Sequence, residues 1–112
     1  MIKEEVKKTI KNELSKIGYN PIYVGTNYLI EAIYLCYELN IPTEKLNLDR
    51  DIYTKVSKIY RKNIKTIKSD IIKATNLVIL NEIYIKEYSC LKNLKITPKL
   101  VICLVTDKLK QQ

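Results

Sequence analysis

Apolar residues recur three and four positions apart along almost the whole chain, which is the spacing that lines one face of an α-helix. Val6, Ile10 and Leu14 begin this pattern, and Gly18 is a natural end for the first helix. With 112 residues, 46% of them hydrophobic, the chain is long enough to bury a core without disulfide or metal support. The sequence therefore predicts a single all-α domain over residues 1–112, a compact bundle of about six helices.

The other helix boundaries are predicted from capping residues and chain breakers. We expect a helix after Gly25 capped by Thr26 or Asn27, a short helix over 43–46, a helix capped by Asp49, a turn over 57–59, a helix over 60–74 and a last helix that starts at Thr97-Pro98. The β-branched run at 77–86 has two interpretations, either continued helix or a small β-hairpin wing. The predicted core contains Tyr28, Leu29, Ala32, Ile33, Ile52, Val56, Ile67, Ile71 and Leu104.

The positive charge of the chain is concentrated in one segment. Residues 50–73 contain eight basic and two acidic residues, a local charge of +6 within a total of +8, whereas residues 17–49 sum to −3. A basic face on a helix that follows a shorter helix suits duplex DNA, because phosphates attract the charge and the major groove admits a helix. The fourth and fifth predicted helices with their short turn are thus a helix-turn-helix candidate. The residues expected to contact DNA are Lys58, Arg61, Lys62, Lys65, Lys68 and Ser69.

Several other functions are disfavoured by what the composition lacks. The chain has no histidine, which is the commonest general base, so we do not expect an enzyme or a small-molecule substrate. Cys36, Cys90 and Cys103 form no Cys-x-x-Cys pair, and we expect them to pack as small hydrophobic residues without binding a metal. Neither glycine opens a phosphate-binding loop, so no cofactor is expected.

Three groups of residues resemble a known family in order and spacing. The first group, Ile17-Gly18, Gly25, Tyr28-Leu29 and Ala32-Ile33, forms an IG…G-x-x-YL-x-x-AI pattern. The second group consists of Leu48, Asp51-Ile52, Lys55, Ile67, Ile71 and Ala74. The third group is Val105 with Asp107-Lys108-Leu109 near the end of the chain. In this order they resemble the C-terminal DNA-binding effector domain of the sporulation response regulator, over about residues 12–110.

The resemblance implies an all-α domain of about six helices that binds short DNA boxes as head-to-tail pairs and regulates transcription. Carried over by position, the recognition helix would be residues 60–74, with Lys62, Lys65 and Lys68 as its basic contacts. The family's arginines are lysines here, and lysine cannot make the two-pronged contact to guanine that arginine makes. Because no receiver domain precedes residue 1, we expect no phosphorylation control within this chain.

Two alternatives remain open at this point. The chain could be a DNA-binding accessory protein of a plasmid or other mobile element, or an interaction module that has lost DNA readout and modulates a full-length regulator. The N-terminus lacks a secretory signal and no apolar window is long enough to span a membrane, so we expect a cytoplasmic, nucleoid-associated protein without membrane contact. Self-association on tandem sites is expected through residues 100–109, with Cys103, Thr106 or Lys110 available to a neighbour.

Overall fold

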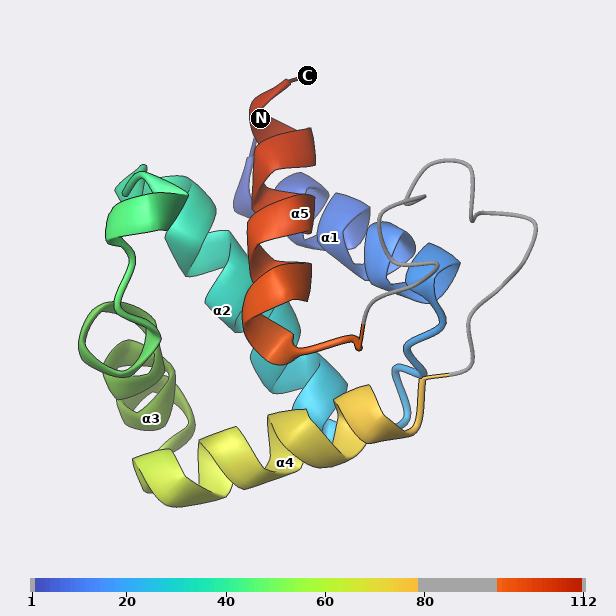
Figure 1. Cartoon of the computed structure of the whole chain (residues 1–112), viewed down its shortest axis with the longest axis vertical. Coiled ribbons are helices and arrows are strands. Elements are labelled where there is room, and N and C mark those ends of the chain that lie inside the picture. Colours follow the sequence, from blue (N-terminus) through green and yellow to red (C-terminus); the bar gives the residue numbers. More distant parts are fainter. Residues whose placement is uncertain (1, 79–94, 112) are drawn as a thin grey trace.

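The computed structural model describes residues 2–78 and 95–111. Its elements, in chain order, are α1 (Lys3–Ile17), α2 (Val24–Leu39), a 3-10 turn η1 (Thr43–Lys45), a π-helical turn η2 (Leu48–Tyr53), α3 (Thr54–Tyr60), α4 (Ile64–Asn76) and α5 (Pro98–Lys110) (Figure 1). The all-α prediction is confirmed for these residues, among which no strand occurs, with five α-helices in place of about six. Beyond residue 78, the segment predicted as helix or hairpin over 77–86 lies outside the described residues.

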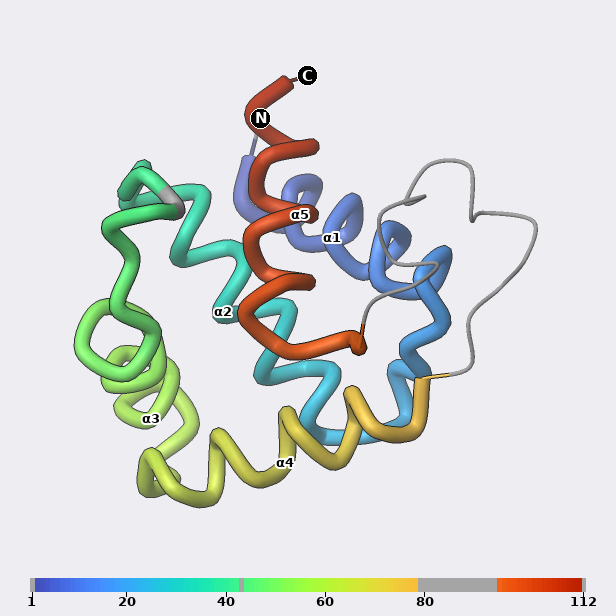
Figure 2. The backbone as a smooth tube through the Cα atoms, viewed as in Figure 1, coloured from blue at the N-terminus to red at the C-terminus, as the bar shows by residue number. Residues whose placement is uncertain are grey.

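Helix α2 forms the centre of the molecule and packs on α1, α3, α4 and α5 (Figure 2). Its sequence is apolar nearly all round, and ten of its sixteen residues are buried, so it behaves as a core helix more than as a surface helix. The predicted core residues are buried together with one exception: Leu104 is half-buried and packs against the edge of the core.

The connector between α1 and α2 is held by its backbone conformation and by hydrogen bonds through two buried hydroxyl groups. Gly18 ends α1 with φ 124°, a conformation that residues with a β-carbon rarely adopt. The hydroxyl of Tyr19 donates a hydrogen bond to Thr75 Oγ1 at 2.9 Å. The Thr75 hydroxyl in turn donates to the carbonyl of Ile71 at 2.8 Å. Burial raises the pKa of Tyr19 to about 12, so the hydroxyl keeps the proton that it donates. The end of α1 is thereby joined to the end of α4.

Two buried carboxylates join α1 to other helices. Glu31 on α2 is 3% exposed and forms an ion pair with Lys7 on α1. Glu13 on α1 is 5% exposed and accepts from Lys108 of α5 at 2.8 Å and from Lys16 at 3.3 Å. Because an unpaired buried carboxylate is strongly unfavourable, these pairs fix the position of α1 on α2 and α5.

Three predicted boundaries are wrong: the start of α2, the cap of η2 and the position of the turn before α4. Helix α2 begins at Val24, and Thr26 donates its hydroxyl to the carbonyl of Asn20 at 2.8 Å instead of capping the helix. Asn47, not Asp49, caps η2 by accepting from the backbone N–H of Arg50 at 3.0 Å. The turn predicted at 57–59 lies at 61–63. The helix predicted over 60–74 therefore begins four residues later, at Ile64, and corresponds to α4.

The start of α5 agrees with the sequence prediction, whereas one of its residues that was expected to be exposed is buried. Thr97 Oγ1 accepts from the backbone N–H of Leu100 at 3.2 Å, and Pro98 opens the helix, as predicted. Thr106, expected to be available to a neighbour, is 1% exposed. Cys36 is buried and Cys103 is half-buried, both as free thiols, while Cys90 lies outside the described residues.

Two helices approach each other closely where the N-terminal turn of α2 crosses α4. A β-carbon on Gly25 would lie 1.9 Å from the carbonyl oxygen of Asp70 and 3.0 Å from the β-carbon of Ala74. The first of these distances is far inside van der Waals contact with backbone that cannot move alone. Only glycine therefore fits at position 25 in this arrangement.

Gly25→Ala is expected to lower the free energy of unfolding by about 2 kcal/mol or more, because α2 and α4 must separate to admit the methyl group. Urea denaturation followed by far-UV circular dichroism measures the change. Asn27→Ala, an exposed position two residues later in the same helix, is the control and should change stability by less than about 0.5 kcal/mol. Equal stability of Gly25→Ala and the wild type would contradict the close crossing.

Candidate nucleic-acid interface

Helix α4 begins at a defined cap. Asn63 has an extended backbone conformation, and its side-chain Oδ1 accepts a hydrogen bond from the backbone N–H of Thr66 at 2.7 Å. This is the bond that an asparagine N-cap makes to the third residue of a helix. It satisfies one of the unpaired N–H groups of the first turn and fixes Ile64 as the first helical residue.

The turn before α4 contains a residue in the left-handed conformation. Arg61 ends α3 with φ 54°, and the backbone N–H groups of Arg61 and Lys62 both point to the carbonyl of Ser57, the latter at 3.1 Å. The bond from Lys62 is the 6→1 bond of a Schellman closure, and the bond from Arg61 is the 5→1 bond of the simpler αL closure; both commonly end a helix. The Ser57 hydroxyl also bonds to the carbonyl of Lys62. Arg61 and Lys62 are therefore exposed turn residues and not part of the helix.

The packing of α4 decides which of its residues face outward. Ile67, Ile71, Ala74 and Thr75 are buried against the core. The opposite face presents an exposed stripe, hereafter the α4 stripe, which consists of Lys65, Ser69, Ile72, Lys73 and Asn76. These positions recur three, four and seven residues apart, the interval that keeps side chains on one side of a helix. The stripe contains no acidic residue.

The structure distributes the six predicted contact residues over three elements. Lys58 is exposed on α3, and Arg61 and Lys62 are exposed in the turn. Lys65 and Ser69 lie in the α4 stripe, as expected. Lys68 lies at the flank of α4, where its Nζ forms an ion pair with Asp49 Oδ2 at 3.1 Å.

Three members of the α4 stripe were not among the predicted contact residues. They are Ile72, Lys73 and Asn76, all in the second half of the helix. The signal that identifies them is the spacing of the buried residues Ile67, Ile71 and Ala74, because it fixes which positions face outward along the helix through residue 76.

Two of the positive charges in this region are compensated by neighbouring carboxylates. Arg50 Nε donates to Asp51 Oδ1 at 2.9 Å, and this contact, together with the backbone N–H of Asn47, holds the pKa of Asp51 below its ordinary value. Lys68 is paired with Asp49 as described. The described residues contain no such ion pair for Lys55, Lys58, Arg61, Lys62, Lys65 or Lys73. These six charges remain available to an anion.

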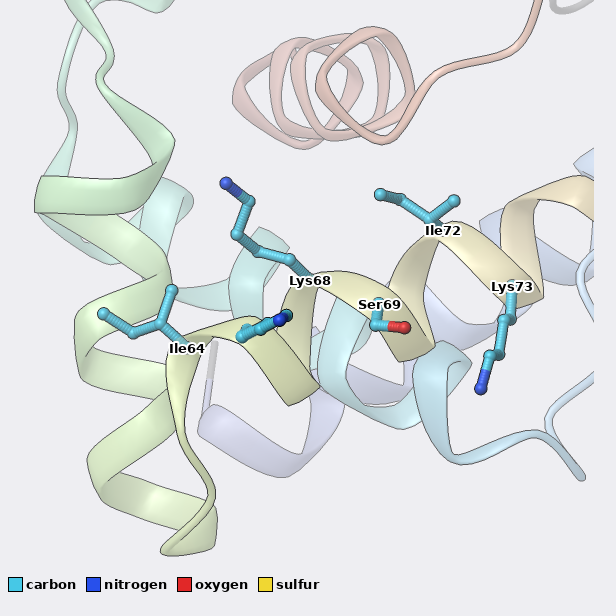
Figure 3. Close-up of a pocket in the computed structure, with 6 residues that line it drawn as sticks. Ile64, Lys68, Ser69, Ile72 and Lys73 are labelled. Atoms are coloured by element: carbon cyan, nitrogen blue, oxygen red, sulfur yellow. The ribbon is translucent and has the colours of Figure 1, made fainter.

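A shallow concavity of about 470 Å³ lies along the exposed side of α4. It is lined by Ile64, Lys65, Lys68, Ser69, Ile72 and Lys73. In Figure 3, Lys68 and Ile72 point from α4 to the side where α5 lies, Lys73 points to the opposite side, and Ser69 lies between them. A second concavity of about 250 Å³ continues from Lys68 and Ile72 to Pro98 and Lys99 of α5. The surface is open and carries several ammonium groups, which suits an extended polyanion.

The remaining observations concern other classes of site. The described residues hold no group of three histidine, cysteine, aspartate or glutamate side chains that could bind a metal ion. No helix in the described part of the chain is long and apolar enough to cross a membrane. No protein-family model matches the sequence, and no curated protein matches it significantly.

Asn63→Ala should lower the free energy of unfolding by about 1 kcal/mol, because the first turn of α4 loses its side-chain acceptor. Asn63→Asp keeps an acceptor oxygen and should retain most of the stability. Asn76→Ala, at the exposed last residue of the same helix, serves as the control in the same urea titration. An Asn63→Ala protein as stable as the Asn63→Asp protein would rule out the cap.

Arg61→Gly is expected to raise stability by up to about 1 kcal/mol, because glycine adopts positive φ without the clash that a β-carbon causes. Lys62→Gly removes the same charge at the neighbouring position, where φ is not positive, and should slightly lower the free energy of unfolding. Thermal unfolding of both variants compares the two positions directly. The strain assignment fails if the two substitutions shift the melting temperature in the same direction.

Proposed function

We propose that this protein binds duplex DNA, with α3, the turn and α4 acting as a helix-turn-helix and the α4 stripe lying in the major groove. The observation that carries the proposal is the composition of the stripe: lysine, serine and asparagine side chains on one exposed face, with the half-buried Asp70 beside them. The other face of α4 is occupied by the core, so the stripe is the side open to a partner.

The surrounding charges support contact with a phosphate backbone. An α-helix with its side chains is about 10–12 Å across and the major groove is about 12 Å wide, so a helix inserted there has phosphates on both sides. Lys55 and Lys58 on α3 and Arg61 and Lys62 in the turn are exposed beside the start of α4. Their position favours contacts to phosphates, which fix the register of a protein on DNA without selecting a sequence.

Selection of a sequence would come from the polar residues of the stripe. Lys65 and Lys73 can donate to guanine O6 and N7 while their charge also neutralises the adjacent phosphates, and Asn76 can pair with the adenine edge. Because lysine is a point charge and not a planar fork, each of these guanine contacts discriminates less strongly than an arginine contact. A transcriptional regulator is the role that best fits this arrangement, and the resemblance of residues 12–110 to the sporulation effector domain supports it.

Duplex affinity should depend steeply on salt, and Lys65→Ala and Lys73→Ala should each reduce the slope of log K against log salt by about 0.9. Lys68→Ala should have a smaller effect, because Asp49 already compensates that charge. Fluorescence anisotropy of a labelled duplex over a salt series measures all three slopes.

The matched controls are Lys8→Ala and Lys11→Ala, two exposed lysines on α1, which lies across the molecule from α4 (Figure 1). They should leave the slope unchanged. If these controls reduce it as much as Lys65→Ala does, α4 is not the contact surface. If the wild type shows no duplex binding at low salt, the proposed function itself is wrong.

A further inference from the structure

One member of the α4 stripe cannot bind a phosphate or donate to a base. Ile72 is 46% exposed and is the exposed apolar residue of α4, since Ile67 and Ile71 are buried and Ile64 is half-buried. Exposed isoleucines occur elsewhere in the chain and are ordinary when they stand alone. Ile72 differs from them in its position, because it lies between Ser69 and Asn76 on a basic surface.

We propose that Ile72 recognises the 5-methyl group of thymine in the major groove, and that the DNA sites of this protein therefore contain thymine at the position opposite Ile72. The inference rests on the proposed function and adds a base preference to it. Thymine is the only base that presents a methyl group in the major groove, and an aliphatic side chain is the natural partner for that methyl.

The geometry of α4 supports this assignment. Ser69, Ile72, Lys73 and Asn76 have the spacing i, i+3, i+4 and i+7, which is the spacing of base contacts from a helix lying along the groove. Ile72 also borders both concavities beside α4, so space for a methyl group exists next to its side chain (Figure 3). Removing a thymine methyl and part of the isoleucine surface from water together would stabilise the complex.

The neighbours of Ile72 argue for a nucleic acid over an apolar partner. Lys65 and Lys73 line the same concavity without an ion-pair partner among the described residues, and Lys99 borders the adjoining one, where Asp49 pairs with Lys68. An apolar protein surface docked there would remove these ammonium groups from water without compensating their charge. A thymine edge places its methyl on Ile72 while the flanking phosphates remain within reach of the lysines.

The experiment replaces thymine by deoxyuridine, one position at a time, in a duplex selected from a random pool by the full-length protein. The exchange removes the methyl and leaves hydrogen bonding and charge unchanged. For the wild type, we expect one or two positions at which the exchange weakens binding about fourfold, the effect of one methyl-sized group. For Ile72→Ala, the thymine and deoxyuridine duplexes should bind equally at those positions.

The control variant is Ile2→Ala, an isoleucine of comparable exposure at the start of α1, which should discriminate thymine from deoxyuridine as the wild type does. Circular dichroism confirms that both variants fold, as expected for exposed side chains. The inference is overturned if the selected site lacks thymine, if the wild type binds both duplexes equally at every position, or if Ile72→Ala still discriminates. Failure of the wild type to bind any duplex would instead remove the proposed function, and this inference with it.

Discussion

The backbone contact between Gly25 and Asp70 sets the position of α4, and most other features of the structure depend on it. At this crossing the first turn of α2 lies against a carbonyl group of α4 without an intervening side chain. Because α2 packs on every other α-helix, fixing α4 on α2 also fixes α4 relative to the whole core. The bond from Tyr19 to Thr75 holds the C-terminal end of α4 in the same way.

The crossing also determines which face of α4 is buried and which is exposed. Apolar residues of α4 are used to bury the helix, and charged residues cannot follow them inward without losing hydration. The lysines and polar residues are therefore gathered on the outward side. The cap at Asn63 and the left-handed residue at Arg61 then decide which basic residues belong to the rigid helix and which to the turn.

Much of the fold follows from local signals, and the main error has a specific cause. The helical class, the end of α1 at Gly18 and the start of α5 at Thr97 come from periodicity and capping, both of which act over a few residues. The apolar spacing predicts a start of this helix at Tyr60, because that residue continues the spacing of Ile64 and Ile67. Tyr60 is 38% exposed, and its ring contacts that of buried Tyr28 at 4.8 Å from the end of α3. An arginine at positive φ gives no sequence signal of the break between the helices. The exposure of Ile72 gives no sequence signal for a similar reason, since an isoleucine in a helical pattern is normally assigned to the core.

The ion pair between Lys68 and Asp49 makes the two long edges of α4 electrically unequal. Along the edge that faces α5, the charge of Lys68 is compensated, and the carboxylate of Asp49 is itself 59% exposed. Along the opposite edge, the ammonium group of Lys73 has no ion-pair partner among the described residues. Asp70 also lines the surface beside Lys65 and Lys73, so the edges differ in how their lysines are held: Lys68 is bound to Asp49, whereas Lys73 is not held in this way. For any approaching polyanion, Lys68 would first have to exchange Asp49 for the new anion, which Lys73 would not.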